Sequence, residues 1–438
     1  MVNNYMKFDY GKIGLEISLD PSWNVTIFRP EKQNIIENPI NAVRNAIKKP
    51  LGTPPLKQII YQKSDLDKIC IVVSDSTRPI PSYIILEGLI KDINEYGVED
   101  EQICILVATG LHRTSKNDEL ERMLGNELKN RLEVIDHVAT DKESQIYIGK
   151  SSNGVPIYNN KNYYNSDIKI LTGYVEPHLF AGFSGGRKSI VPGIVGQETI
   201  LGNHSAEMID SPYARFGIYK KNPLHKNMLE IAKKVGVDFI VNVCINVQHK
   251  ITKIAAGDLE RVHEQLVDYQ LEHAFKEISE PFDIVVCGNG GYPLDLDLYL
   301  AVKSMLIGEM GVKKKGTIIA VNECIDGIGK DTFRDLLNLG IKPKEIYEKV
   351  MNKEIEVLDK WGIQVLTRVM MKADIYVVSE LKEKEFGNVG LKYASSVENT
   401  INLALKKHGK DAKILILPNG PQLLPLLKKK KSSLNLVN

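Results

Sequence analysis

The chain of 438 residues lacks the features that mark membrane-spanning and disulfide-stapled proteins. No apolar run reaches the roughly 18–20 residues that a membrane span needs, and the N-terminal stretch MVNNYMKFDYGK lacks the apolar core of a secretory signal. Its five cysteines are an odd set without a C-x-x-C pair, which predicts reduced thiols in a cytoplasmic protein. The net charge is only +2, so neither a nucleic acid nor a membrane is expected as a partner.

Motifs of the common nucleotide and metal sites are missing as well. No G-x-G-x-x-G follows a predicted strand, which argues against an NAD-linked dehydrogenase. No H-x-x-x-H or H-E-x-x-H spacing occurs, so a conventional zinc site is not predicted. The stretch FSGGRKS, residues 183–189, resembles a phosphate-binding loop but has Arg187 where that loop has glycine. Lys188 is therefore either an ordinary solvated lysine or has a role other than holding a triphosphate.

What the sequence does contain is an alternation of apolar and amphipathic segments. Apolar runs rich in β-branched residues are typical of strands covered on both faces. They occupy residues 68–75, 101–110, 167–173, 238–246, 283–291, 316–323, 373–380 and 413–420. Amphipathic segments such as 82–97 and 224–236 lie between them and predict helices. The alternation predicts an α/β fold made of two Rossmann-like α/β domains with mostly parallel sheets.

A charged segment with a proline near residues 270–282 divides the predicted strands into two groups of four. We therefore expect an N-terminal cofactor-binding and catalytic domain over residues 1–272. A C-terminal domain over residues 273–438 would complete the substrate site. Two domains of this kind would leave an active-site cleft between them, which is a common place for small-molecule sites.

Polar side chains follow three of the predicted strands. Asp75, Ser76, Thr77 and Arg78 come after the first strand, His112 after the second and His178 after the third. Ligands of parallel α/β sheets bind outside the carboxyl ends of the strands, so these residues are candidates for one site. Either histidine alone is more simply read as structural, but two of them can serve as acid and base near neutral pH.

The segment 171–204 is unusually rich in glycine, with seven glycines in 34 residues. Glycine permits close backbone approach, and long loops in compact domains are usually functional. His178, Lys188 and His204 all lie in this segment. The second half offers weaker signals: by themselves, Lys303 would be a surface lysine and Trp361 a packed aromatic residue.

Seven motifs in order resemble the lactate racemase family of nickel-pincer-nucleotide-dependent 2-hydroxyacid racemases and epimerases. They are DSTRP, ATGLHR, GYVEPH, FSGGRKSIVPGIVG, GNH, NGGYPLD with its following lysine, and LPNGPQLLP. The resemblance spans about residues 10–425. It implies a small 2-hydroxyacid substrate, a cytoplasmic enzyme, and cofactor-synthesis proteins as maturation partners; it leaves a homodimer open.

The resemblance also implies a covalently tethered cofactor, the nickel(II) pyridinium bisthiocarboxylate mononucleotide. Lys188 would carry it through a thioamide, and His204 would be the protein ligand of the nickel. Such a pincer together with one histidine would give nickel four ligands, in keeping with its square-planar preference. The segment from Asp75 to Arg78, which includes Ser76 and Thr77, would contact the cofactor.

For the substrate, the resemblance implies His112 and His178 as acid and base, Arg78 and Lys303 as cations, and Trp361 as a lining residue. The chemistry would be hydride transfer through a 2-ketoacid, because a histidine is a poor base for a Cα–H beside a carboxylate. A glutamine is expected three residues before the substrate lysine, yet Leu300 stands there. This difference favours a substrate with a longer or more apolar side chain than lactate.

Other functions fit parts of the pattern. A C2 epimerase of sugar acids or a diacid racemase would belong to the same class, although DLYLAVKS offers a diacid no further cation before Lys303. A non-catalytic nucleotide- or phosphate-binding α/β protein would explain the glycine-rich segment and Arg78, but not the paired histidines.

Overall fold

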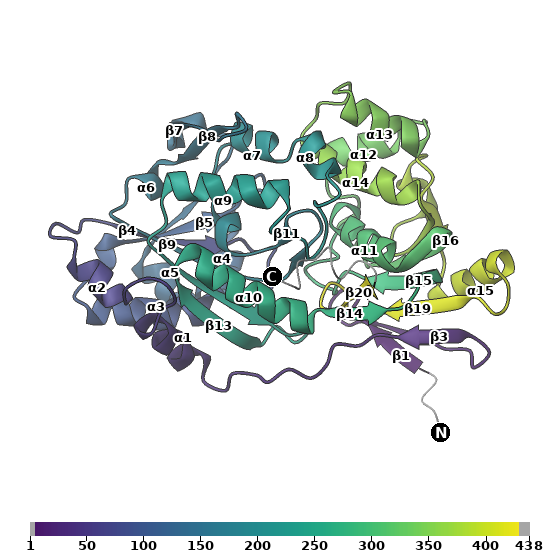
Figure 1. Cartoon of the computed structure of the whole chain (residues 1–438), viewed down its shortest axis with the longest axis horizontal. Helices are drawn as coiled ribbons and strands as arrows, with labels where there is room; N and C mark the ends of the chain where they lie inside the picture. The colour runs from purple at the N-terminus through teal and green to yellow at the C-terminus, as the bar shows by residue number, and fades with distance from the viewer. Residues whose placement is uncertain (1–4, 429–438) are drawn as a thin grey trace. The chain divides into compact units, whose positions relative to one another are not determined.

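The computed structural model describes residues 5–428, and contacts divide the chain into two compact units (Figure 1). One unit comprises residues 32–271, and the other combines residues 1–31 with residues 272–438. The first 31 residues thus group with the C-terminal half, whereas we expected them in the N-terminal domain. The reason is that β3 (Asn24–Ile27) pairs in parallel with β19 (Lys413–Leu417). The units are described separately below.

A six-stranded sheet in the order β13-β12-β9-β4-β5-β6 forms the centre of unit 32–271. Its strands are β4 (Ile69–Ser74), β5 (Ile103–Ala108), β6 (Glu133–Asp136), β9 (Ile168–Tyr174), β12 (Phe239–Ile245) and β13 (Ile251–Gly257). All neighbours pair in parallel except β12 and β13. Residues 69–73 are all buried, so both faces of β4 are covered, which explains why its sequence is apolar without alternation.

Helices cover both faces of this sheet. One face packs against α1 (Pro39–Lys48), α2 (Leu56–Tyr61), α3 (Ser82–Glu95), α4 (Asn117–Leu124) and α5 (Asn126–Arg131). On β12, Val243 and Ile245 belong to that core, so Cys244 between them faces the other side of the sheet. Its thiol lies 3.9 Å from the Leu266 carbonyl on that opposite face. Leu266 belongs to α10 (Leu259–His273), which lies beside α9 (Pro223–Val235) in Figure 1. The sheet is therefore the middle layer of three.

Local signals explain where these helices begin and end. Asn222 caps α9 by accepting the backbone N–H of Leu224 at 3.0 Å, and Pro223 stands at the first helical position. Gly236, with φ of 91°, ends the helix. The remaining elements of this unit are α6 (Lys161–Tyr164), α7 (Gln197–Asn203), α8 (Ala206–Asp210), β7 (Gln145–Lys150), β8 (Pro156–Asn160), β10 (Pro177–His178), β11 (Gly182–Phe183), η1 (Asp100–Gln102), η2 (Lys142–Ser144) and η3 (Gly186–Ser189).

The other unit contains a fully parallel sheet in the order β18-β17-β16-β15-β19-β3. Its further strands are β15 (Phe282–Gly288), β16 (Val312–Val321), β17 (Asp374–Val378) and β18 (Lys392–Ala394). One face packs on α15 (Val397–His408) and on the hairpin of β1 (Tyr5–Phe8) and β2 (Leu15–Ser18). The remaining elements are α11 (Leu298–Gly311), α12 (Asp331–Leu337), α13 (Pro343–Met351), α14 (Lys360–Met370), η4 (Glu383–Phe386), and the paired strands β14 (Phe275–Ile278) and β20 (Leu424–Leu427).

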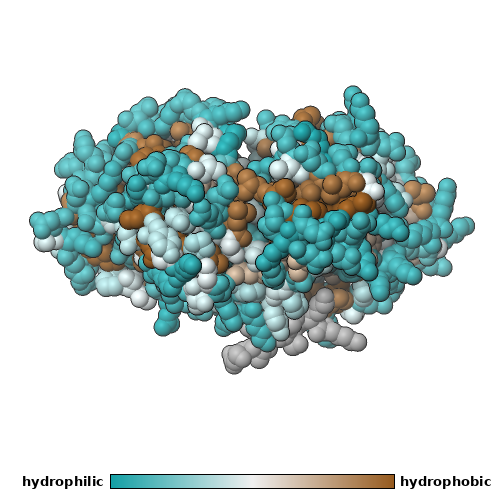
Figure 2. Space-filling view, turned by 90° about the horizontal axis from the view of Figure 1, so that it is seen from above, coloured by the Kyte–Doolittle hydropathy of each residue, from teal (hydrophilic) through white to brown (hydrophobic). Residues whose placement is uncertain are grey.

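The structure confirms the predicted fold class. All eight predicted strands are present, and both main sheets are mostly parallel. The five cysteines are buried free thiols, as expected. No helix within residues 5–428 combines the length and apolar character needed to cross a membrane, and the face seen in Figure 2 is mainly hydrophilic.

Candidate functional site

Three predicted site segments leave the sheet of unit 32–271 from neighbouring strands. β4 pairs in parallel with β5 on one side and with β9 on the other. Their carboxyl ends therefore lie at one edge, and residues 75–78, 109–112 and 175–178 follow them there. This topology brings the segments with Asp75, His112 and His178 to the same end of the sheet.

Asp75 and His112 are in direct contact. Nδ1 of His112 lies 2.6 Å from Oδ2 of Asp75, and the hydroxyl of Thr77 donates to Oδ1 at 2.8 Å. Asp75 is only 5% exposed. Burial works against ionisation of Asp75, but the charges of His112 and Arg78 and the hydrogen bonds outweigh it, so its pKa lies below the usual value. The structure shows Asp75 as the partner of His112, and its expected contact with the cofactor stays a prediction.

The neighbouring residue Ser76 has a different partner. Its hydroxyl interacts with Glu119, which also binds the guanidinium of Arg113 at 2.6 Å. The bond with Arg113 is the main cause that lowers the pKa of Glu119 to about 2. Ser76 is thus engaged with the start of α4, while Thr77 supports the Asp75–His112 pair.

Backbone hydrogen bonds connect the His112 loop to the Lys188 segment. The amide of His112 donates to the Thr109 carbonyl at 2.9 Å, and the amide of Gly110 donates to the Gly193 carbonyl at 3.0 Å. The amide of Gly193 in turn donates to the Lys188 carbonyl at 3.3 Å. The positions of the His112 and Lys188 backbones are therefore coupled.

His178 sits on a short hairpin formed by β10 and β11. Its Nδ1 accepts the backbone N–H of Ala181 at 3.2 Å and that of Phe180 at 3.5 Å. The ring of Phe180 meets the imidazoles of His178 and His204 edge-on, with centroid distances of 4.8 and 5.1 Å. Phe180 thus bridges the predicted acid/base residue and the predicted nickel ligand.

The FSGGRKS segment rests on the ends of β9 and β12. The amide of Gly186 donates to Oδ1 of Asn242 at 2.8 Å, and the hydroxyl of Ser189 donates to the Thr172 carbonyl at 3.1 Å. Gly185 has φ of +73°, and a Cβ there would lie 2.8 Å from the Tyr174 carbonyl oxygen. Glycine is required at this position for both reasons. The sequence analysis did not name Asn242, although a polar residue inside the apolar run FIVNVCI was a usable signal.

Arg187 points into the protein, not toward a phosphate. It is 1% exposed, and its guanidinium donates to the carbonyls of Ala181 and Gly185 at 2.9 and 3.1 Å and faces Nε2 of His263 at 2.9 Å. No carboxylate is among its hydrogen-bond partners within residues 5–428, and burial lowers its pKa to about 9. The side chain that breaks the phosphate-loop pattern therefore ties the segment together from within.

Lys188 and His204 lie close enough to interact electrostatically. His204 follows α7, is buried, and donates its backbone N–H to the Ile200 carbonyl at 2.8 Å. Burial, followed by the positive charge of Lys188, lowers the pKa of His204 to about 3. His204 is therefore neutral at physiological pH, the form in which histidine binds metals.

The other predicted site residues belong to the second unit, which combines residues 1–31 with residues 272–438. Leu300 and Lys303 lie on α11, and Trp361 lies on α14. The indole N–H of Trp361 donates to the Tyr299 hydroxyl at 2.8 Å, and that hydroxyl donates to Asp359 at 3.3 Å. Tyr299, which the sequence analysis missed, thus links Trp361 to the start of the helix that carries Leu300 and Lys303. The predicted cleft between the domains stays a prediction.

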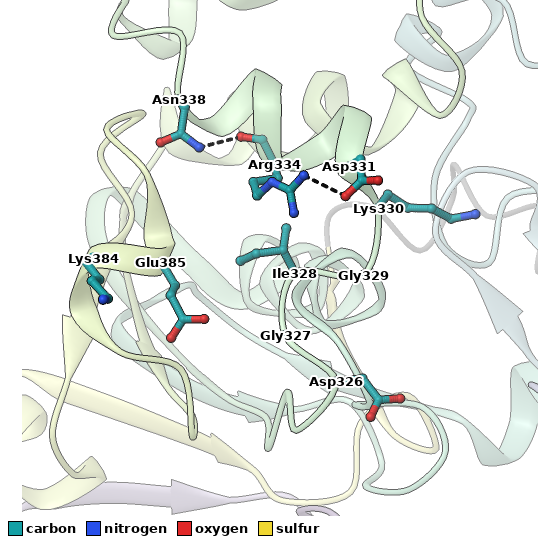
Figure 3. Close-up of a pocket in the computed structure, with 10 residues that line it drawn as sticks. All are labelled: Asp326, Gly327, Ile328, Gly329, Lys330, Asp331, Arg334, Asn338, Lys384 and Glu385. Atoms are coloured by element: carbon teal, nitrogen blue, oxygen red, sulfur yellow. Dashed lines mark hydrogen bonds and ion pairs between the residues drawn. The ribbon is translucent and has the colours of Figure 1, made fainter.

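A polar cavity of about 500 Å³ lies in this second unit (Figure 3). Its walls are the loop 326–331, Arg334 and Asn338 of α12, and Lys384 and Glu385 of η4. The carbonyls of Gly327 and Ile328 accept the N–H groups of Leu298 and Tyr299 at the start of α11. The sequence analysis named none of these residues. Three acidic and three basic side chains line the cavity, so charge alone selects no ligand.

Comparisons with known proteins cover nearly the whole chain. The family model described as "Lactate racemase N-terminal domain" matches residues 10–217, and the one described as "Lactate racemase C-terminal domain" matches residues 278–424. The lactate racemase of Thermoanaerobacterium thermosaccharolyticum is 34% identical over 422 residues, 95% of this chain and 97% of that protein. The lactate racemase of Lactiplantibacillus plantarum is 36% identical over 385 residues, 86% of this chain and 89% of that protein.

Solved structures agree with these matches. The structure of the lactate racemase apoprotein from Thermoanaerobacterium thermosaccharolyticum aligns with a TM-score of 0.88 at 32% identity. The alignment covers 96% of this chain and 99% of that chain. A crystal structure of a Thermotoga maritima protein, at 19% identity and a TM-score of 0.68, covers 91% of this chain and 100% of that chain and shares the fold.

Proposed function

This chain belongs to the lactate racemase family of isomerases, and we propose that it interconverts the D and L forms of a 2-hydroxyacid. The observation that carries the proposal is the contact of 2.6 Å between His112 and Asp75, in the same unit as Lys188 and His204. A histidine backed by a buried carboxylate is a common form of general base. Membership of a racemase family leaves no support for an NAD-linked dehydrogenase or a non-catalytic phosphate-binding protein.

The residues of unit 32–271 fit a tethered nickel-pincer nucleotide. His204 is held as a neutral imidazole, and Lys188 offers a primary amine close to it. Residues 5–428 contain no group of three or more His, Cys, Asp or Glu side chains arranged for a metal. A nickel ion at His204 would therefore take its other ligands from the nucleotide. When bound, this group would supply the acceptor and donor of hydride, and its attachment would need cofactor-synthesis proteins.

The chain itself would bind the substrate and handle the proton. Arg78 and Lys303 would hold the carboxylate, since cations of this kind suit a carboxylate partner. His112 would accept the hydroxyl proton at Nε2, and Asp75 would stabilise the resulting imidazolium. Arg78 and Lys303 would retain the transient 2-ketoacid while it turns its other face, and His178 would then reverse the proton step by returning a proton to the oxygen.

The side chain of the substrate would lie near Leu300 and Trp361. Leu300 stands where the family resemblance implies a glutamine, so an amide that hydrogen-bonds the substrate is replaced by an apolar group. Each methylene group of the substrate that is buried against an apolar wall contributes about 0.8 kcal/mol to the free energy of binding. We therefore favour lactate or a longer, more apolar 2-hydroxyacid over sugar acids and diacids.

The attachment site can be tested by intact-mass analysis of protein made with the cofactor-synthesis proteins and nickel. The wild-type protein should carry an adduct that is lost in Lys188→Ala and kept in Lys221→Ala, because Lys221 is an exposed lysine outside the site. His112→Ala and His178→Ala should keep the adduct and lose turnover. Racemisation assays over short and branched 2-hydroxyacids then identify the substrate.

Two results would contradict the proposal. One is an unmodified wild-type protein under conditions that load a known lactate racemase. The other is a loaded protein that racemises none of the 2-hydroxyacids tested.

A further inference from the structure

The polar cavity of the second unit lies at the edge of a sheet where ligands of α/β proteins bind. The loop 326–331 comes after β16, and η4, which carries Lys384 and Glu385, comes after β17. Because β16 and β17 pair in parallel, both segments leave the sheet at its carboxyl edge. The cavity volume of about 500 Å³ is that of a small-molecule site.

Some of the charges in the cavity wall have a partner of opposite sign. Nζ of Lys330 lies 3.6 Å from the carboxylate of Asp359, and Figure 3 shows this lysine directed away from the other labelled residues. Nη2 of Arg334 lies 2.7 Å from the carboxylate of Asp331. The side chains of that pair are 52% and 85% exposed, so the pair contributes little and Arg334 can exchange its partner for another carboxylate. Two further charged residues are exposed and lie at the edge of the labelled group in Figure 3: Asp326 and Lys384.

Two opposite charges face the middle of the cavity. Figure 3 shows Arg334 of α12 and Glu385 of η4 pointing inward, with Ile328 between them. The guanidinium has five N–H donors, most of which the contact with Asp331 leaves free. Oε2 of Glu385 accepts the backbone N–H of Lys382 at 2.8 Å, and Oε1 has no hydrogen-bond partner within residues 5–428. A cationic and an anionic group are therefore both available to one ligand.

We propose that this cavity binds a small zwitterion, an amino acid that carries an ammonium and a carboxylate group in one molecule. The carboxylate binds the planar fork of Arg334, which suits it geometrically. The ammonium group binds Glu385, and the aliphatic part contacts Ile328. A ligand with one charge satisfies one wall and is repelled by the other, so neither a simple anion nor a simple cation fits.

The wall of this site also caps the helix α11. The Gly327 carbonyl accepts the backbone N–H of Leu298 at 3.0 Å. The Ile328 carbonyl accepts that of Tyr299 at 3.2 Å. Leu298 and Tyr299 begin the helix that carries Lys303, so a ligand packed on Ile328 stabilises the first turn of that helix. The consequence for substrate binding rests on the proposed function, whereas binding in the cavity does not.

Binding is tested by isothermal titration calorimetry of cofactor-free protein with glycine, L-leucine and 4-aminobutyrate. At least one of them should bind, and L-leucinamide and 4-methylpentanoate, which each lack one charge, should bind more weakly than L-leucine if L-leucine is the ligand. Arg334→Met and Glu385→Gln should weaken binding at least about tenfold, since each removes a charged hydrogen-bond partner. Lys344→Met is the control, because it breaks the exposed pair with Glu348 outside the cavity and should leave binding unchanged. If none of the three zwitterions binds, or if Arg334→Met and Glu385→Gln bind as tightly as the wild-type protein, the proposed site is wrong.

The link to α11 is tested by hydrogen exchange of the Leu298 and Tyr299 amides. A bound zwitterion should slow their exchange, and this slowing should be absent in Glu385→Gln at the same ligand concentration. In loaded enzyme the zwitterion should change KM for the 2-hydroxyacid, and Glu385→Gln should not show the change. Unaltered exchange with ligand bound would overturn the link. Wild-type protein that binds the zwitterion, carries the cofactor and racemises nothing would instead refute the proposed function and leave the site in the cavity standing.

Discussion

Acidification should destabilise unit 32–271 through the buried histidine His137. Its ring is fully buried: Nε2–H donates to the Val195 carbonyl at 3.0 Å, and the amide of Asn160 donates to Nδ1 at 3.1 Å. The amide orientation is fixed, because Oδ1 of Asn160 accepts the backbone N–H of Asn162 at 3.0 Å. The ring is therefore neutral, and a proton on Nδ1 would break its contact with Asn160.

The size of the effect follows from the pKa of His137. Burial lowers it from 6.5 to about 4, against smaller raising effects of the Val195 carbonyl and Asp141. Between these values the unfolded chain binds the proton and the folded chain does not, so stability falls as the pH falls from 6.5 toward 4. The loss reaches about 2 kcal/mol at pH 5 and about 3 kcal/mol below pH 4.

His137→Gln provides the comparison, since glutamine can donate to the Val195 carbonyl but does not titrate. Urea unfolding should be followed by far-UV circular dichroism at pH 7 and pH 5, because both tryptophans, Trp23 and Trp361, belong to the other unit. The wild-type protein should lose about 2 kcal/mol more than the variant between the two pH values. NMR titration of His137 in the folded protein gives the pKa directly. Equal losses in the two proteins, or a His137 pKa near 6.5, would refute the reasoning.

Two further substitutions test the segment that carries Lys188. Arg187→Met should lower the free energy of unfolding by about 3 kcal/mol or more, because it leaves the buried carbonyls of Ala181 and Gly185 without their donor; an unchanged thermal midpoint would contradict this. Gly185→Ala should reduce cofactor attachment, measured by intact mass, as well as stability, since its Cβ would meet backbone and a conformation with φ of 73° and ψ of −177° costs other residues about 1–3 kcal/mol. Gly97→Ala is the matched control: it also has positive φ, but nothing lies within 4 Å of its Cβ. Equal thermal midpoints in the two alanine variants would show that the clash is unimportant.

The strands could be predicted well because a strand that is buried on both faces is a continuous run of apolar residues in the sequence. β4 and β5 are apolar at nearly every position, and no alternation has to be resolved. The edge strand β3 has no such signal: its sequence NVTI is short and only partly buried, and its partner β19 lies almost 400 residues away. Local sequence patterns carry no information about such a long-range strand pairing. The assignment of residues 1–31 to the N-terminal domain was wrong for this reason.

Local sequence patterns were equally unable to predict the directions of individual side chains in the candidate site. Strand-end topology was enough to bring Asp75, His112 and His178 to one edge of the sheet. It could not show that Asp75 contacts His112, because that depends on how the turn after β4 directs one side chain. It likewise could not show that Arg187 points inward while Lys188, the next residue, remains partly exposed. A short η3 turn separates the two directions, and its backbone is set by contacts with Asn242.

The backbone, more than the side chains, sets the spacing between His112 and Lys188. The chain of hydrogen bonds from Gly110 to Gly193 and on to the Lys188 carbonyl involves no side-chain atom of His112 or Lys188. Replacing either side chain therefore leaves these bonds in place, so loss of function in such a variant reports chemistry and not misplacement of the loops. Gly185 and Arg187 behave differently, because their substitution acts on the backbone that holds the spacing. A His112 variant that lost the cofactor adduct as well as turnover would show that this separation of scaffold from chemistry is wrong.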